Sequence, residues 1–116
     1  MSDCVVGTIM TNQGIGEALA EIDVGLLRSN VGDKYVSREL VKENLNVGGE
    51  TSGHVIQREF SESGDANIAL IQTLTAFSDL DATMTDIQKK INYWPHKLQS
   101  YDVKNEALLC SNEFNQ

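Results

Sequence analysis

The amino-acid sequence predicts an α/β fold, in which a sheet of about four strands is packed between helices. Two observations support this class. Short β-branched apolar runs alternate with segments whose apolar residues recur at helical spacing, an order typical of strands joined by crossover helices. The chain has 116 residues, of which 41% are apolar, and this length and composition suit one globular domain with its own core.

The first third of the chain predicts a strand, a helix and a second strand. Residues 5–10 form a short, apolar, β-branched run, and residues 26–31 are a second strand candidate. Between them, apolar side chains recur at intervals of three and four residues from Ile15 to Ile22, which places them on one face of a helix that Gly25 is expected to end. This order predicts two parallel strands connected by the helix.

The middle of the chain predicts a second helix, a third strand and a long third helix. The second helix is expected to begin at Gly32-Asp33, with Asp33 as its N-cap. Residues 55–60 have the composition of a strand. From residue 66 to residue 80 the apolar side chains fall on nearly every side, which is typical of a buried helix.

The last part of the chain predicts one more helix and then a tail. Thr85 and Gln88 fit a capping box for a short helix, and Pro95 marks its end. Trp94 is expected to pack on the core. A strand-like segment is expected at 98–103, followed by a disordered or linker-like tail.

Composition narrows the class of protein. Nine basic and seventeen acidic residues give a net charge of −8, which argues against a surface for nucleic acid or for anionic lipid. No apolar run approaches the roughly 20 residues of a membrane span, and the start lacks a secretory signal, so a cytoplasmic protein is expected. Cys4 and Cys110 have no CxxC partner and are expected to be free thiols.

The densest chemistry lies at residues 49–54, which read Gly-Glu-Thr-Ser-Gly-His. An ionised Glu50 can accept hydrogen bonds from two neighbouring hydroxyls, Ser52 can donate or accept, and His54 can move a proton near neutral pH. In an extended loop, their alternation places the three side chains on one side. The sequence therefore predicts a clamp for sugar hydroxyls. The alternative is a polar glycine-rich hairpin that binds nothing.

Two other patterns do not predict sites. Gly14 and Gly16 lack the third glycine of a dinucleotide-binding fingerprint, so they indicate only a turn into a helix. Asp79, Asp81 and Asp86 lack the spacing of a calcium loop and are interpreted as solvated residues that cap helices. No metal site is predicted in this chain.

Four segments together resemble one enzyme family. Residues 49–56 resemble the G-E-x-S-G-H sugar-binding loop of the α-D-phosphohexomutases. Residues 31–36 (V-G-D-K-Y-V) and 6–12 (V-G-T-I-M-T-N) are similar to segments of the phosphoglucosamine mutase branch of that family. Residues 63–65 (S-G-D) resemble its turn before a long helix, although Ala66 stands where the branch usually has glycine.

The resemblance implies a domain and a reaction. Residues 1–103 would be the third of the family's four domains, an α/β/α unit with a mixed sheet, and 104–116 a linker or tail towards a missing fourth domain. The family interconverts 6-phospho and 1-phospho sugars, and this branch acts on glucosamine 6-phosphate and glucosamine 1-phosphate. A phosphoglucomutase or phosphomannomutase domain remains an alternative, as does a non-catalytic α/β interaction module.

The resemblance also implies residue roles. Glu50 and Ser52 would bind sugar hydroxyls, His54 would lie beside the transferring group, and Lys34 would supply positive charge to the phosphate or the reacting oxygen. His54 and Lys34 are thus the catalytic candidates. The substrate-binding loops are completed by Gly32, Asp33, Gly49, Thr51 and Gly53.

Other components of the family's site have no counterpart in this sequence. The phosphoserine loop, the Mg²⁺-binding loop and the phosphate-binding loop belong to the family's other domains. Phosphoryl transfer requires a positioned donor, a cation and an in-line nucleophile. We therefore expect no cofactor in this chain and no mutase activity by the chain alone. Its expected partners are a phosphorylated hexosamine and the missing domains.

Overall fold

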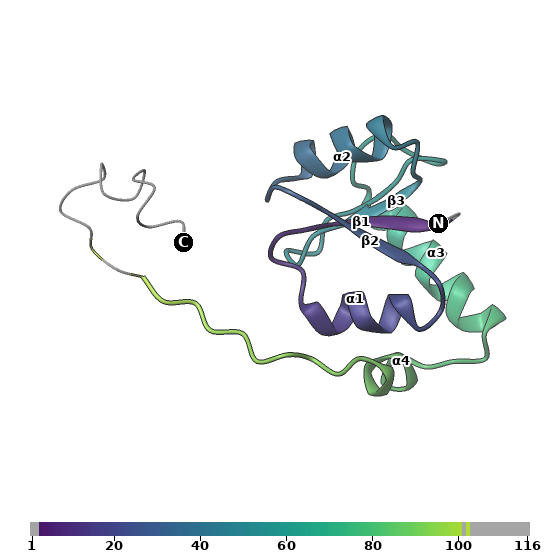
Figure 1. Cartoon of the computed structure of the whole chain (residues 1–116). Helices are drawn as coiled ribbons and strands as arrows, with labels where there is room; N and C mark the ends of the chain where they lie inside the picture. Colours follow the sequence, from purple (N-terminus) through teal and green to yellow (C-terminus); the bar gives the residue numbers. More distant parts are fainter. Residues whose placement is uncertain (1–2, 101, 103–116) are drawn as a thin grey trace.

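A computed structural model describes residues 3–100 and 102 (Figure 1). Its sheet has four strands in the order β2-β1-β3-β4. Strand β1 pairs in parallel with both β2 and β3, and β3 pairs antiparallel with β4, so the sheet is mixed as expected. The strands are β1 (Cys4–Thr8), β2 (Gly25–Ser29), β3 (Val47–Gly49) and β4 (Val55–Gln57).

Helices lie on both faces of the sheet (Figure 1). Helix α2 packs on β1 and β3, whereas α1 packs on β2 from the opposite face and α3 packs on β4. The predicted α/β/α layering is therefore confirmed. The helices are α1 (Gln13–Ala20), α2 (Asp33–Lys42), α3 (Ala66–Asp79) and α4 (Met84–Lys90).

The fully buried core lies between α2 and the sheet. Val6 and Ile56 from the strands meet Val36 and Leu40 from the helix, and all four side chains are at most 2% exposed. Gly48 allows this close approach, since a Cβ at this position would lie 2.7 Å from the Val36 side chain. The apolar periodicity of α2 thus becomes the principal packing contact of the domain.

The start of α2 differs from the prediction. Gly32 is the N-cap, with φ of +126°, and Asp33 is the first helical residue. The Asp33 carboxylate accepts a hydrogen bond of 2.7 Å from the Lys34 backbone N–H, within the first turn. The prediction of Asp33 as N-cap is wrong, because the capping position requires a backbone conformation that glycine adopts far more easily.

The capping box of α4 is also displaced from the predicted residues. Thr83 is the N-cap, its hydroxyl receives the Asp86 N–H, and the Asp86 carboxylate receives the Thr83 N–H at 2.9 Å. Thr85 lies inside the helix, where its backbone no longer offers a free N-cap position. The motif exists, but two residues earlier than the pair Thr85 and Gln88 indicated.

Helix α3 is not buried, contrary to the prediction. None of its residues is buried, and Leu70 and Leu74 are each 58% exposed. The helix packs on β4, which is the edge strand of the sheet, so the described structure covers one side of it only. The sequence predicted a buried helix because apolar residues fall on nearly every side of it. The described residues supply too few neighbours to cover all of those sides.

Two further predictions fail, and the predictions for Cys110 and the tail lie outside the described residues. Trp94 is 52% exposed and does not pack on the core. Residues 98–100 form no strand; the fourth strand is β3, whose sequence Val-Gly-Gly carries little strand signal. Cys4 is a free thiol, whereas Cys110 and the predicted tail at 104–116 lie outside the described residues.

Among residues 3–100 and 102, no helix has the length and apolar composition that a membrane span requires.

Candidate functional site

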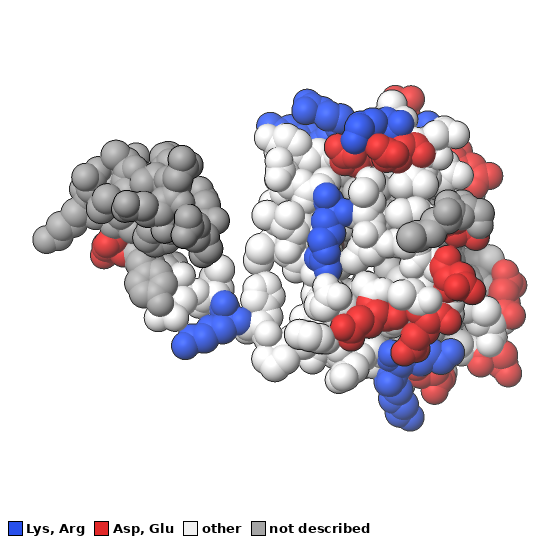
Figure 2. Space-filling model, in the orientation of Figure 1, with Lys and Arg blue, Asp and Glu red and all other residues white. Residues whose placement is uncertain are grey.

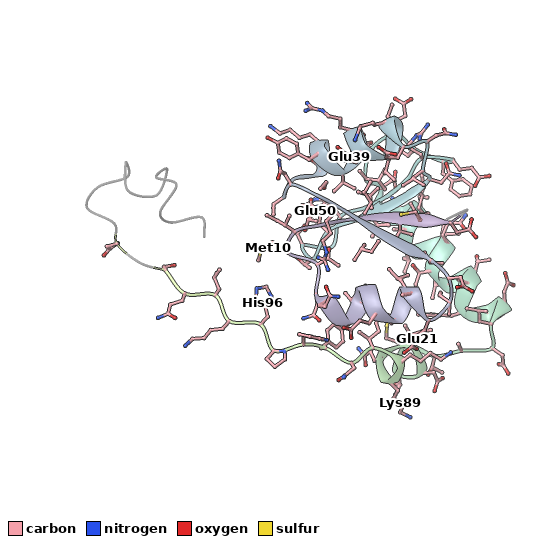
Figure 3. The ribbon with its side chains drawn as sticks, viewed as in Figure 1. Met10, Glu21, Glu39, Glu50, Lys89 and His96 are labelled. Carbon is pink, nitrogen blue, oxygen red and sulfur yellow. The ribbon has the colours of Figure 1, made fainter. Side chains whose placement is uncertain are left out.

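The candidate residues gather at one edge of the sheet. Because β1, β2 and β3 run parallel, their carboxyl ends share an edge, where the loops 9–12, 30–32 and 50–54 follow them. The first crossover runs from β1 to β2, and the second runs from β2 back past β1 to β3, so the direction of winding reverses beside β1. Open α/β sheets bind ligands at such a reversal. Met10 and Glu50 mark this end of the sheet in Figure 3.

Glu50 is anchored to the start of α2. The Gly32 backbone N–H donates to Glu50 Oε1 at 2.8 Å, and the Glu50 side chain is only 9% exposed. The carboxylate thus lies at the N-terminus of a helix, where the helix dipole favours negative charge. This hydrogen bond joins segment 31–36 to segment 49–56. The sequence linked these two segments only through their shared resemblance to the family.

The loop itself is a closed turn and not the extended segment that the sequence predicted. The Glu50 N–H donates to His54 O at 2.9 Å, and the Gly53 N–H donates to Glu50 O at 3.0 Å. Gly53 has φ of +96°, a conformation that glycine adopts without strain. The turn connects β3 to β4 and brings together the side chains of Glu50, Ser52 and His54.

The side chains of Ser52 and Glu50 both approach the Nδ1 atom of His54. Ser52 Oγ lies 3.1 Å from His54 Nδ1, and Glu50 Oε2 lies 3.9 Å from the same nitrogen. A serine–histidine–acid triad requires the serine and the acid on opposite ring nitrogens, so this cluster is not a nucleophilic triad. The arrangement instead orients the imidazole, and no described residue contacts its Nε2 within hydrogen-bonding distance. The His54 side chain is 64% exposed.

Lys34 lies on the first turn of α2, two residues after Gly32. Its Nζ rests 4.8 Å from the centre of the Tyr35 ring, and the Arg38 guanidinium lies 5.8 Å from the same ring. Figure 2 shows the basic side chains of α2 gathered over this helix. Within residues 3–100 and 102, no hydrogen bond or ion pair joins Lys34 to Glu50.

The remaining predicted residues surround this cluster. Asp33 and Thr51 are exposed, and Gly49 ends β3 immediately before Glu50. A Cβ at Gly49 would lie 3.3 Å from His54 O, so the closure of the turn favours a small residue there. In the part of the chain that the structure describes, no three His, Cys, Asp or Glu side chains gather as a set of metal ligands.

Two cavities among the described residues lie beside or away from the site and do not enclose it. A cavity of about 310 Å³ reaches Glu50 and Thr51, but most of its lining is apolar and comes from β1, β3 and α1. A larger cavity of about 450 Å³ lies between α1 and β2, and no candidate residue lines it. Ser52 and His54 are exposed, so these two polar side chains lie at an open surface at the edge of the sheet.

The mixed four-stranded sheet with helices on both faces defines the class of this chain as an open α/β/α domain. The chain belongs to the phosphoglucomutase/phosphomannomutase family, since residues 1–93 match the family's α/β/α domain III.

Its relatives include proteins named phosphoglucosamine mutase. The one from Dictyoglomus thermophilum is 38% identical over 100 residues, which cover 86% of this chain and 22% of the relative. The one from Dictyoglomus turgidum is 39% identical over 102 residues, with 88% and 23% covered. The one from Lactococcus lactis is 35% identical over 105 residues, with 90% and 23% covered. The chain thus spans about a quarter of the length of these relatives.

Proposed function

We propose that this domain binds the sugar in a phosphoglucosamine mutase, an isomerase that interconverts glucosamine 6-phosphate and glucosamine 1-phosphate. The observation that carries the proposal is the Glu50 carboxylate held at 2.8 Å by the Gly32 N–H beside Ser52 and His54. The identity of 38–39% to enzymes of that name supports the choice of substrate pair. A bond already formed in the free domain lowers the entropic cost of orienting the carboxylate for a ligand.

The clamp would act through acceptors and donors that remain free. Oε1 of Glu50 uses one lone pair on Gly32, and Oε2 keeps its own lone pairs for a sugar hydroxyl. Ser52 can then donate to or accept from the neighbouring hydroxyl. Since adjacent hydroxyls offer donors and acceptors side by side, one turn can hold the sugar in two orientations.

Charge and proton movement would come from His54 and Lys34. The Nδ1 atom of His54 is occupied within the turn, which leaves Nε2 to face the reacting oxygen. Lys34 would leave the Tyr35 ring and approach the phosphate as a compact positive charge. Both residues touch substrate in this proposal and are therefore its catalytic residues.

The phosphoryl donor and its metal would be supplied by other parts of a longer protein. A Mg²⁺ ion, when bound, neutralises charge on the transferring group. The described residues of this chain gather no metal-ligand cluster, so they do not fit such an ion. Because charged sugar phosphates do not cross a bilayer unaided, we place the reaction in the cytoplasm.

An NMR titration tests the binding role. Glucosamine 6-phosphate should shift the amide signals of residues 50–54 and 32–34, with a dissociation constant of about 1 mM or weaker. Glucosamine without phosphate should leave Lys34 unshifted. Shifts confined to other surfaces would instead favour a non-catalytic interaction module.

An enzyme assay tests the division of labour. With magnesium and a sugar bisphosphate present, the 116-residue chain should form glucosamine 1-phosphate no faster than the blank. Turnover above the blank would show that this chain carries the phosphoryl-transfer machinery and would overturn that part of the proposal.

A further inference from the structure

The side chain of Asn12 binds the backbone of a residue 82 positions away. Asn12 Nδ2 donates to Trp94 O at 2.9 Å, and the Trp94 N–H donates to Asn12 Oδ1 at 3.0 Å. A reciprocal pair of this kind is what two antiparallel strands exchange. The side-chain amide of Asn12 thus pairs with the Trp94 backbone, within segment 92–94, as a neighbouring strand would.

The same amide caps α1. Asn12 Oδ1 accepts the Gly14 N–H at 3.0 Å, so both lone pairs of this oxygen are used. Two further contacts hold the segment against α1. The Trp94 indole N–H donates to Glu17 Oε2 at 3.0 Å, and a Cβ at Gly14 would lie only 2.0 Å from Asn92 O. Segment 92–94 therefore lies directly on the first turn of α1.

Arg28 holds the loop that carries Asn12. Its guanidinium donates to the Thr8 and Thr11 carbonyls from β2, and Nη2 reaches Gln13 Oε1 at 3.2 Å. These contacts fix both ends of the loop between β1 and α1. The Asn12 amide is consequently oriented before segment 92–94 reaches it.

Little else in the described structure holds segment 92–94. Helix α4, which precedes it, has no buried residue, and every residue from Asn92 to Ser100 is exposed. Because these residues are exposed, burial of apolar side chains cannot hold segment 92–94 in place. Directional hydrogen bonds must therefore hold it.

We propose that Asn12 is a positioning residue that clamps segment 92–94 to the carboxyl edge of the sheet, the edge that carries Glu50. The clamp thereby sets where the chain from Pro95 onward leaves the domain. Figure 3 shows His96, two residues beyond Trp94, pointing towards the loop of Met10 at this edge. The proposal does not depend on the identity of the sugar.

The alternative is that Asn12 is only a helix cap, and Asn12→Asp separates the two roles. Aspartate keeps an oxygen for the Gly14 N–H and is an equally good N-cap. It also keeps an oxygen for the Trp94 N–H, but it loses the Nδ2 donor and places a charged oxygen against Trp94 O, and this repulsion should open the reciprocal pair. Asn46→Asp, at an exposed asparagine whose side chain makes no hydrogen bond to the described residues, controls for the added negative charge.

Trp94 is the only tryptophan in the chain, so its fluorescence and its single indole signal report on the clamp alone. In Asn12→Asp we expect hydrogen exchange at the Trp94 backbone amide to accelerate about fivefold, as loss of one hydrogen bond implies, with stronger acrylamide quenching. The Gly14 amide and the far-ultraviolet circular dichroism should be unchanged, as in Asn46→Asp. Unchanged Trp94 exchange in folded Asn12→Asp would overturn the proposal.

Glu17→Ala provides the second measurement, which does not require a change at Asn12. Removing the indole acceptor should accelerate exchange of the indole N–H while the Trp94 backbone amide stays protected. If the backbone amide loses its protection as well, Glu17 holds the segment and the assignment of the clamp to Asn12 is wrong.

Discussion

The carboxylate of Glu50 and the backbone N–H of Gly32 form a 2.8 Å hydrogen bond that ties the β3–β4 turn to the start of α2. Gly32 reaches this position with φ of +126°, so the bond depends on a glycine conformation as well as on a carboxylate. One contact therefore couples the turn that carries Glu50, Ser52 and His54 to the helix that bears Lys34.

Substitutions of Glu50 should separate anchoring from ligand binding. Glu50→Gln keeps an oxygen for the Gly32 N–H, so we expect unfolding free energy to change by less than about 1 kcal/mol. Glu50→Ala leaves that donor without its partner and should cost about 1–3 kcal/mol in urea denaturation. Both variants should lose sugar-phosphate binding. If Glu50→Gln unfolds as easily as Glu50→Ala, the negative charge and not the hydrogen bond anchors the turn.

Gly32→Ala should destabilise the domain even though Gly32 is partly exposed. An alanine would keep φ in a region that L residues rarely adopt, and its Cβ would lie 3.2 Å from the Tyr35 ring. We expect a loss of about 1–3 kcal/mol in unfolding free energy. Gly16→Ala is the control, because Gly16 is helical and its nearest neighbour is the movable end of Leu26. An equal loss in both variants would contradict the conformational argument.

Ser52→Ala tests whether the hydroxyl acts on the ligand or on the fold. Ser52 is exposed, so unfolding free energy should change by no more than about 0.5 kcal/mol. Loss of one ligand hydrogen bond should weaken glucosamine 6-phosphate binding by roughly threefold to tenfold, measured by NMR titration. Unaltered affinity would restrict Ser52 to orienting His54 through Nδ1.

Acidification should destabilise α4, because it protonates the Asp86 carboxylate that caps the helix. Hydrogen bonds from the Thr83 hydroxyl and backbone lower the pKa of Asp86 below its ordinary value of 3.8. A depressed folded-state pKa stabilises the helix above the ordinary value, and this contribution is lost as pH falls through the folded-state pKa. Amide signals of α4 should therefore shift in this acid range in the native chain but not in Asp86→Asn. An identical acid response in the variant would assign the transition to another group.

Much of the fold follows from local pattern. The runs at β1 and β2 and the helical spacing of α1 and α2 predicted the parallel crossover, because apolar periodicity must match the face that an element buries. Strand β3 was missed, because Val-Gly-Gly has almost no β-branched content and becomes a strand only by pairing with β1 and β4. The burial of α3 was overestimated because periodicity records which faces are apolar and not whether a neighbour covers them.

The sequence by itself determined the fold class, the family resemblance and the identity of the residues in the Glu-Thr-Ser-Gly-His turn. Only the tertiary structure decided that Glu50 binds Gly32, that Ser52 and Glu50 address the same nitrogen of His54, and that Asn12 binds Trp94. For the contacts of Glu50 with Gly32 and of Asn12 with Trp94, the physical reason is distance along the chain. For His54 it is the closed turn that the backbone hydrogen bonds of Glu50 and Gly53 form. Local spacing specifies which face a residue occupies, whereas hydrogen bonds between residues 18 or 82 positions apart exist only after the sheet has aligned the ends of its strands.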